Sequence, residues 1–195
     1  TMTFWGTYLN VNYGYDRDGL PSGLTDNSYI RRYWQGNLEL IAVMLDVHEA
    51  TQDDAFLRDT LLVLAPPLLR FYRDVYPERD SDGRMRMAPS QSLETWWEVV
   101  NPSPDIAGLQ WVLDRLLALP ETLVAAALRD EWQAFRDILP PLPIGGEGSD
   151  ATLLPAEALE NTPKNTENPE LYAVFPYRFY GVGKPDLNTA LNAWR

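Results

Sequence analysis

Glu94 stands beside two tryptophans in the polar segment MAPSQSLETWW, residues 87–97. Hydrolysis of a glycosidic bond usually takes two carboxyl groups, one to protonate the leaving oxygen and one to activate water or attack. The acid must stay protonated near neutral pH, which an apolar environment favours. The aromatic faces of Trp96 and Trp97 could supply that environment and stack on sugar rings. The segment is therefore a candidate sugar site, and a capping or solvated glutamate is the alternative.

The other carboxylates and the one histidine have simpler structural explanations. Asp105 follows Pro104 at the head of an expected helix, where the helix dipole favours negative charge in any case. Glu167 and Glu170 flank Pro169 in an aromatic loop, where a structural role is favoured over a catalytic one. His48 has no cysteine partner, so it is a poor metal ligand or triad member. We therefore expect no metal and no cofactor.

Composition narrows the classes of function. The net charge is −12 and the pI is about 4.4, which excludes ordinary nucleic-acid binding because phosphates would be repelled. There is no cysteine, and no apolar run approaches the roughly 20 residues of a membrane helix. We expect a carbohydrate partner, with no nucleic acid and no membrane. The compartment stays open, with an extracellular or periplasmic site among the possibilities.

Hydrophobic periodicity predicts a mainly helical chain. The expected helices cover residues 28–50, 54–76, 104–118, 121–139 and a last stretch from about Pro185. Pro66 and Pro67 should kink or split the second of these. Residues 87–103 and 140–169 are expected as loops, with one short element at 151–159 and a short strand at 84–88. Long loops at one end of helical hairpins predict an all-α fold, an incomplete (α/α)6 toroid with at most short β elements.

The ends of the sequence suggest a piece of a longer polypeptide. The chain starts at Thr1, and LNTALNAWR at its end reads as an unfinished helix. We expect residues 1–195 to form a single partial barrel domain. Cutting a helical ring exposes apolar faces, so we expect the rest of the longer chain, or an association, to cover them.

Several stretches together resemble one family of bacterial proteins. These are FWGTYLNVNYG, YIRRYWQGNLELIAVMLD, APSQSLETWWEVVNPSPDIAGL and NPELYAVFPYRFYGVGKPDL. They are similar to glycoside hydrolase-like proteins with a six-hairpin (α/α)6 barrel, related to glycoside hydrolase family 95. That family contains α-L-fucosidases and α-galactosidases. The resemblance covers nearly the whole chain and implies a hydrolase of O-glycosyl bonds that acts on carbohydrate.

The resemblance also implies roles for particular residues. The family's general acid is a glutamate in a Pro-Ser-x-Ser-x-Glu-like loop, which Pro89 to Glu94 match, so Glu94 is implied as the acid. An aspartate heads the family's next helix, so Asp105 is implied to touch substrate or support the site. The other expected substrate-binding residues are Trp34, Gln35, Trp96, Trp97, Asn168 and Glu170.

Two departures from the family pattern affect the expected activity. The family activates its water with an Asn–Asp arrangement, which this alignment places upstream of Thr1 and beyond Arg195. The pair Asn10 and Asn12 resembles that arrangement only superficially. The chain alone is thus expected to carry the acid without the base, and to be inactive by itself. The stretch NTENPELYAVFP also lacks the family's histidines, which puts fucose specificity in doubt.

Two other functions stay open at this point. A carbohydrate-binding helical domain would use the same Trp and Asn residues without performing chemistry. A polysaccharide lyase toroid would need a base, for which Tyr172 or Tyr177 could serve, and a cation such as Arg178 to neutralise a uronate. The net acidity of the chain argues against a polyanionic substrate.

Overall fold

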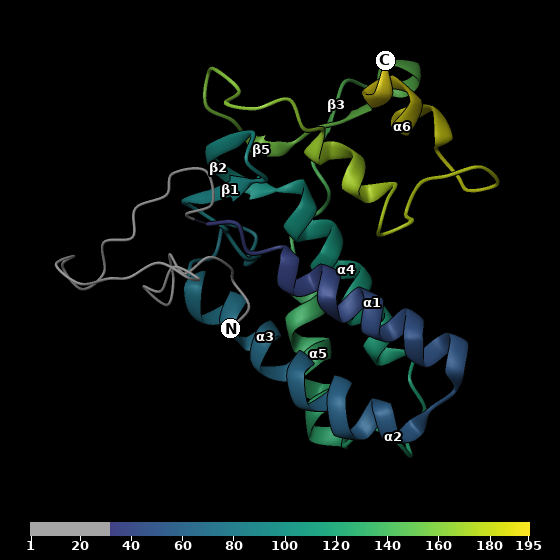
Figure 1. Ribbon diagram of the computed structural model, residues 1–195. Helices are drawn as coiled ribbons and strands as arrows, with labels where there is room; N and C mark the ends of the chain where they lie inside the picture. The colour runs from purple at the N-terminus through teal and green to yellow at the C-terminus, as the bar shows by residue number, and fades with distance from the viewer. Residues whose placement is uncertain (1–31) are drawn as a thin grey trace, which may run out of the picture.

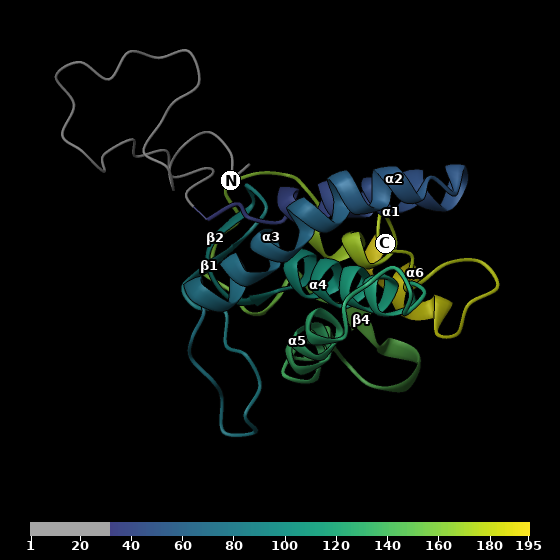
Figure 2. The same cartoon turned by 90° about the horizontal axis from the view of Figure 1, so that it is seen from below.

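The computed structural model describes residues 32–195, so the aromatic N-terminal stretch and the pair Asn10 and Asn12 lie outside the described residues. Its longer helices are α1 (Gly36–Thr51), α3 (Leu62–Val75), α4 (Ser103–Leu117) and α5 (Ala126–Asp137). They lie side by side as a bundle (Figure 1), and Figure 2 shows α4 between α1 and α5. No described helix is both long and apolar enough to cross a membrane.

The helical stretch expected over residues 54–76 is present and is not split at its prolines. Asp53 caps its start by accepting hydrogen bonds from the backbone N–H groups of Ala55 and Phe56. Helix α2 (Asp54–Phe56) continues through a π-helical turn, η3 (Leu57–Leu61), into α3. Pro66 and Pro67 both lie inside α3. The wider turn occurs just before the point where the prolines remove backbone donors.

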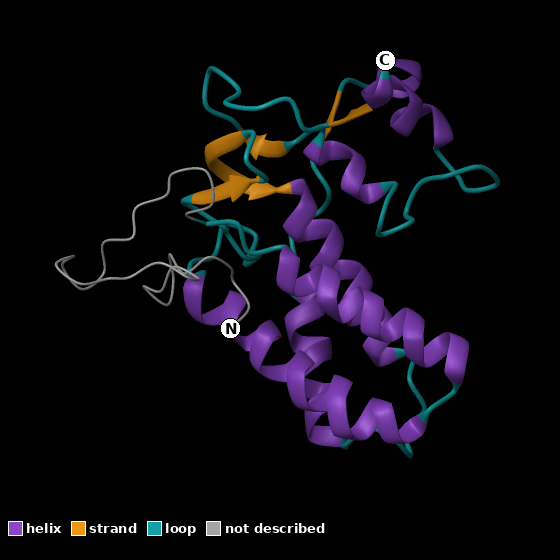
Figure 3. Ribbon diagram, viewed as in Figure 1, coloured by secondary structure: helices purple, strands orange, loops and turns teal. Residues whose placement is uncertain are grey.

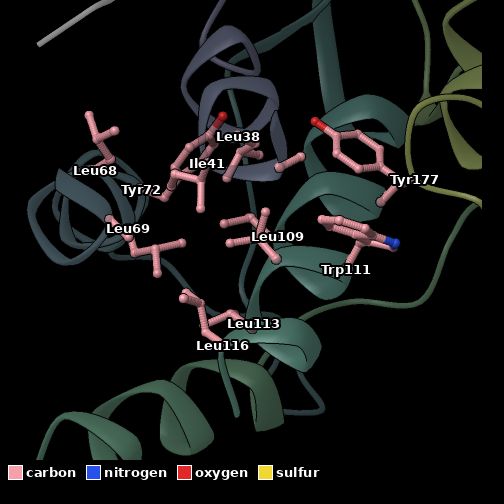
Figure 4. Packing of buried hydrophobic residues seen from close by; sticks show 14 of the residues in the cluster. Leu38, Ile41, Leu68, Leu69, Tyr72, Leu109, Trp111, Leu113, Leu116 and Tyr177 are labelled. Carbon is pink, nitrogen blue, oxygen red and sulfur yellow. The ribbon is translucent and has the colours of Figure 1, made fainter. Parts of the chain in front are cut away.

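The core forms where α1 and α3 face α4. Leu38 and Ile41 of α1 lie opposite Leu109 of α4 (Figure 4), and all three are fully buried. Gly108 allows this close approach, because a Cβ atom there would lie 2.7 Å from both Leu38 Cδ1 and Tyr177 Oη. Each fully buried aliphatic side chain contributes about 1.5–3 kcal/mol. The well-packed bundle therefore provides a rigid support for the strands and loops at its other end.

The expected all-α fold, an incomplete (α/α)6 toroid with at most short β elements, is wrong. The structure is 49% helical and 12% strand, with two small antiparallel sheets in the described residues (Figure 3). The stretch expected as a loop forms a hairpin of β1 (Ser90–Ser92) and β2 (Trp96–Pro102). Strand β5 (Ala156–Ala158) pairs with the other edge of β2. Because β2 runs directly into α4, this sheet is fixed to the N-terminal end of that helix.

Local composition explains the hairpin. The sequence WWEVV in β2 combines aromatic and β-branched residues, which favour strands. Ser90 pairs with Val99, and Ser92 pairs with Trp96, with an irregularity between them. The turn between the strands starts at Leu93, whose φ is +52°. Pairing with β1 and β5 therefore determines the strand structure of residues 96–102. The turn-forming residues on either side of this segment had instead predicted a loop.

The remaining elements lie around the same end of the bundle. Strands β3 (Ile144–Gly145) and β4 (Thr152–Leu153) form the second sheet, with η4 (Gly148–Asp150) between them. Helix α6 (Leu187–Trp194) is joined to this part through Asn192, whose Nδ2 donates to the carbonyl groups of Ser149 and Ala151. The short helix η5 (Pro169–Ala173) packs against α4. Helix α5 begins five residues later than expected, after a turn at residues 121–123.

Candidate functional site

Glu94 lies at the tip of the β1–β2 hairpin. Glu94 is the middle residue of the three-residue turn between Ser92 and Trp96, and it is partly exposed. The residue expected on a loop before a helix is therefore held on a turn that two paired strands fix. A hairpin tip keeps its backbone geometry better than a free loop of the same length.

The loop at residues 160–168 braces this turn from the other side. One carboxylate oxygen of Glu167 accepts hydrogen bonds from the backbone N–H of Glu94, at 2.8 Å, and from Thr95 Oγ1, at 3.1 Å. The backbone N–H of Lys164 donates to the carbonyl oxygen of Thr95, at 2.7 Å. Glu167 thus has the structural role that its sequence context favours, because its carboxylate holds the backbone of the candidate acid.

The carboxyl group of Glu94 is itself oriented. Asn165 Nδ2 donates to Glu94 Oε2 at 3.2 Å. A donor at one carboxyl oxygen restricts the orientation of the group. The indole Nε1 of Trp97 donates to the backbone carbonyl oxygen of Glu94 at 2.7 Å. The side chain and the backbone of Glu94 are therefore both held by named partners.

Trp96 and Trp97 lie at the start of β2, and each ring is partly exposed. The backbone N–H of Trp97 donates to Glu160 Oε1 at 2.6 Å. Lys164 Nζ lies 3.2 Å from Glu160 Oε2 and 5.8 Å from the centre of the Trp97 ring. Trp97 is thus anchored at its backbone and at its indole nitrogen, and the Lys164 ammonium lies over its ring.

Trp34, one of the expected substrate-binding residues, is buried in the structure. Its side chain is only 6% exposed, and its Nε1 donates to Tyr76 Oη at 3.1 Å. Tyr76 Oη in turn donates to Ser90 Oγ of β1 at 2.9 Å. Trp34 thus ties α1 to the hairpin from inside the protein, and burial keeps its ring away from a substrate.

Asp105, the other residue expected to contact substrate or support the site, is also buried. It lies in the first turn of α4, is 1% exposed, and accepts a hydrogen bond from Tyr72 Oη at 2.6 Å. Burial raises the pKa of this carboxyl group to about 7. The family resemblance allowed contact with substrate or support of the site, and the structure favours support.

The other expected substrate-binding residues lie just before α1 and at the start of η5. Gln35 directly precedes α1 and is 2% exposed. Asn168 precedes η5 and is exposed, whereas Glu170, inside η5, is partly buried, which raises its pKa. Asn168 also borders an apolar pocket of about 410 Å³ between η5 and α6.

His48 makes a local contact in the structure. His48 is buried at the end of α1, and its Nε2 lies 3.4 Å from Asp54 Oδ1. In residues 32–195, no group of three or more His, Asp or Glu side chains is placed to hold a metal ion.

Removing the brace on the turn should destabilise the hairpin. For Glu167→Ala we expect a loss of about 1.5–3 kcal/mol in unfolding free energy, because two hydrogen bonds to a charged group disappear. Denaturant unfolding of both proteins measures this loss. Glu121→Ala is the matched control, since Glu121 is exposed in a turn far along the chain. An equal effect of the two substitutions would show that Glu167 does not brace the turn.

Comparison with known proteins adds no assignment. No protein-family model matches the chain, and no curated protein matches it significantly. Asn165, Glu160 and Lys164 contact the hairpin but were not among the expected site residues. Their one common signal is the polar stretch ENTPKNTENPE before η5, whose contacts with residues about 60–70 positions earlier only the fold reveals.

Proposed function

We propose that this chain belongs to the catalytic domain of a glycoside hydrolase, and that Glu94 is the general acid of an inverting reaction. The observation that carries the proposal is the fixed and partly exposed carboxyl group of Glu94. Asn165 orients that group at 3.2 Å, and Glu167 holds its backbone at 2.8 Å. Trp96 and Trp97 lie directly after it in the same hairpin.

In the proposed reaction, Glu94 gives its proton to the glycosidic oxygen as the bond to the sugar breaks. A water molecule attacks the anomeric carbon from the opposite face, and a base takes a proton from that water. Glu167 is unsuited to be the base, because one of its oxygens already accepts two hydrogen bonds from the turn. The proposal therefore assigns the acid alone to the described residues.

Two structural features argue against the lyase alternative. Burial raises the pKa of Tyr177 well above its usual value, so this phenol stays protonated and cannot accept a proton. Arg178 Nη2 forms an ion pair with Asp46 at 2.6 Å, which occupies the cation proposed for a uronate. Burial also raises the pKa of Tyr172, the other phenol considered as the base. Neither phenol is therefore suited to accept a proton, and the Arg178 cation is already paired.

A binding domain without chemistry remains the second candidate, because partly exposed tryptophans also suit simple sugar recognition. Proton NMR of aryl glycosides incubated with the protein at its natural length separates the candidates. We expect the first product to have the opposite anomeric configuration to the substrate. Retained configuration would reject the inverting mechanism, and an unsaturated product with ultraviolet absorbance would indicate a lyase. Binding without any product would favour the binding domain.

A further inference from the structure

The apolar pocket of about 410 Å³ between η5 and α6 is not used by the residues assigned so far, and we call it the η5–α6 pocket. Helix α6 packs against η5 near the C-terminus (Figure 1). Seven of the nine described residues that line the pocket are apolar, and the other two are Asn168 and Tyr172. None of the nine carries a charge, so the pocket is suited to a neutral ligand.

Two large aromatic side chains of this pocket are left open to solvent. Phe175, directly after η5, is 76% exposed, and Trp194, at the end of α6, is 71% exposed. A single exposed apolar side chain is ordinary, but two that line one pocket form a patch of the kind that marks a binding site. Aromatic rings pair well with other flat rings, by stacking or by edge contacts. The pocket therefore favours a ligand that carries an aromatic group.

Hydrogen bonds connect one border of the pocket to the candidate acid. Asn168 lines the pocket, and its chain neighbour Glu167 accepts a hydrogen bond from the backbone N–H of Glu94 at 2.8 Å. The carbonyl oxygen of Glu167, in the peptide bond to Asn168, lies 3.4 Å from Thr95 Oγ1. Consecutive Cα atoms are about 3.8 Å apart, so Asn168 is one residue-length from a direct contact with the hairpin tip. The pocket thus begins next to the turn that carries Glu94.

The size of the pocket indicates how large the aromatic group is. An apolar cavity of about 150 Å³ holds one benzene ring. A pocket of about 410 Å³ therefore has room for two fused rings, even though it is open on one side. Its polar border faces the hairpin at Asn168, and the rest of its lining is almost entirely apolar. This arrangement suits a molecule with a sugar at one end and an apolar ring system at the other.

We propose that the η5–α6 pocket binds the aglycone of the substrate, and that this aglycone is a neutral aromatic group. The inference rests on the proposed hydrolase function. When Glu94 protonates the glycosidic oxygen, the bond from that oxygen to the anomeric carbon breaks, and the aglycone leaves as a neutral alcohol or phenol. Water supplies the new hydroxyl group of the sugar. Phe175 and Trp194 hold the aromatic rings of the aglycone before and after this step.

Binding of matched glycosides tests the inference without requiring turnover. The probes are the 2-naphthyl and methyl α-glycosides of D-galactose, L-fucose and D-glucose, together with 2-naphthol, titrated calorimetrically into the protein at its natural length. For at least one sugar we expect the naphthyl glycoside to bind about tenfold or more tightly than the methyl glycoside, because its rings are removed from water. It should exceed 2-naphthol by a similar factor, because one molecule then fills two neighbouring sites.

Variants of the two exposed rings locate this gain in the pocket. Trp194→Ala and Phe175→Ala should each raise Kd for the naphthyl glycoside about fivefold or more and leave Kd for the methyl glycoside within about twofold. Val182→Ala is the matched control, because Val182 lies between η5 and α6, is 95% exposed and does not line the pocket. It should change neither Kd. Circular dichroism checks that each variant folds, as the exposure of both rings leads us to expect.

Several results would overturn the inference. Equal affinities for naphthyl and methyl glycosides would show that the aglycone makes no contact, and so would unchanged affinities in both ring variants. Equal affinities for 2-naphthol and its glycosides would show an apolar site without connection to a sugar. Sedimentation velocity tests the other occupant, a second copy of the chain. A dimer that Trp194→Ala dissociates would assign the pocket to that copy and reject the aglycone. Failure of all the probes to bind rejects it too.

The outcomes also separate this inference from the proposed function. If Glu94→Gln keeps full turnover of methyl glycosides, the assignment of the acid fails, whatever the naphthyl compounds show. Loss of that turnover, together with unchanged naphthyl binding in Trp194→Ala and Phe175→Ala, would reject the aglycone site alone.

Discussion

Glu94→Gln is expected to lower kcat/KM about 10²–10⁴-fold toward glycosides whose leaving group is an ordinary sugar alcohol. Glutamine keeps the size of the side chain and its place beside Asn165 Nδ2, but it has no proton to give. The leaving oxygen would then depart as a strongly basic alkoxide. Steady-state hydrolysis by the protein at its natural length measures the loss.

The dependence on the leaving group makes this prediction specific to an acid. A dinitrophenolate or a fluoride ion is stable without protonation, so glycosides that carry such groups need little help from Glu94. We expect Glu94→Gln to hydrolyse them within about tenfold of the unaltered rate. A purely structural role would instead reduce hydrolysis of all substrates by the same factor.

Glu98→Gln is the matched control for this experiment. Glu98 lies on the same hairpin, but its carboxylate is exposed and pairs with Arg32 Nη1 at 2.8 Å. A surface ion pair of this kind contributes about 0–1 kcal/mol, so activity should stay close to that of the unaltered protein. Full activity of Glu94→Gln toward alkyl glycosides would reject Glu94 as the acid.

The helices were the most predictable part of this fold. Periodic apolar residues such as Leu38 and Ile41 predicted α1, and Pro104 marked the start of α4 at about the right place. These signals are local, since a helix makes its backbone hydrogen bonds within a few residues. The helix through Pro66 and Pro67 was also found; of the kink or split expected there, the split does not occur.

The sheet was missed because its hydrogen bonds join distant residues. Val100 pairs with Ala158, and no local sequence pattern predicts this pairing. The WWEVV sequence did favour a strand, but the prolines and serines around it favoured a loop. In this segment the β-branched and aromatic residues determine the structure, and the turn-forming residues lie at its edges.

The sequence also predicted only part of the candidate site. Sequence pattern and family resemblance selected Glu94, Trp96 and Trp97, which lie together on one hairpin. They also selected Trp34 and Asp105, which are buried in the structure. Residue type cannot tell a buried tryptophan from one that faces a sugar, because that distinction depends on which elements cover it.

The carboxyl group of Asp105 should make the stability of the protein depend on pH. Its pKa is raised by burial from about 3.9 in the unfolded chain to about 7 in the folded one. Between these values the folded state binds the extra proton, so the contribution of Asp105 to stability falls as pH rises from 4 to 7. Above pH 7 the buried carboxylate opposes folding with its full effect, about 4 kcal/mol.

Asp105→Asn should therefore raise unfolding free energy at pH 8.5 by about 2–3 kcal/mol, while changing it little or lowering it at pH 5. The amide oxygen of asparagine can still accept the hydrogen bond from Tyr72 Oη, which is 2.6 Å long in the parent protein. Its NH₂ group needs a partner in the interior, which sets the size of any loss at pH 5. Denaturant unfolding at the two pH values measures both effects.

Asp114→Asn provides the comparison, because Asp114 lies on the same helix but forms an exposed ion pair with Arg136 Nε at 2.7 Å. Its replacement should cost less than about 1 kcal/mol at both pH values. The difference between pH 5 and pH 8.5 is the decisive quantity, since Glu39 and Glu170 also have raised pKa values and affect parent and variant alike. If Asp105→Asn destabilises the protein at pH 8.5, the charged carboxylate stabilises the folded state. Asp105 would then be a candidate for direct contact with a substrate or a cationic group, as the family resemblance first allowed.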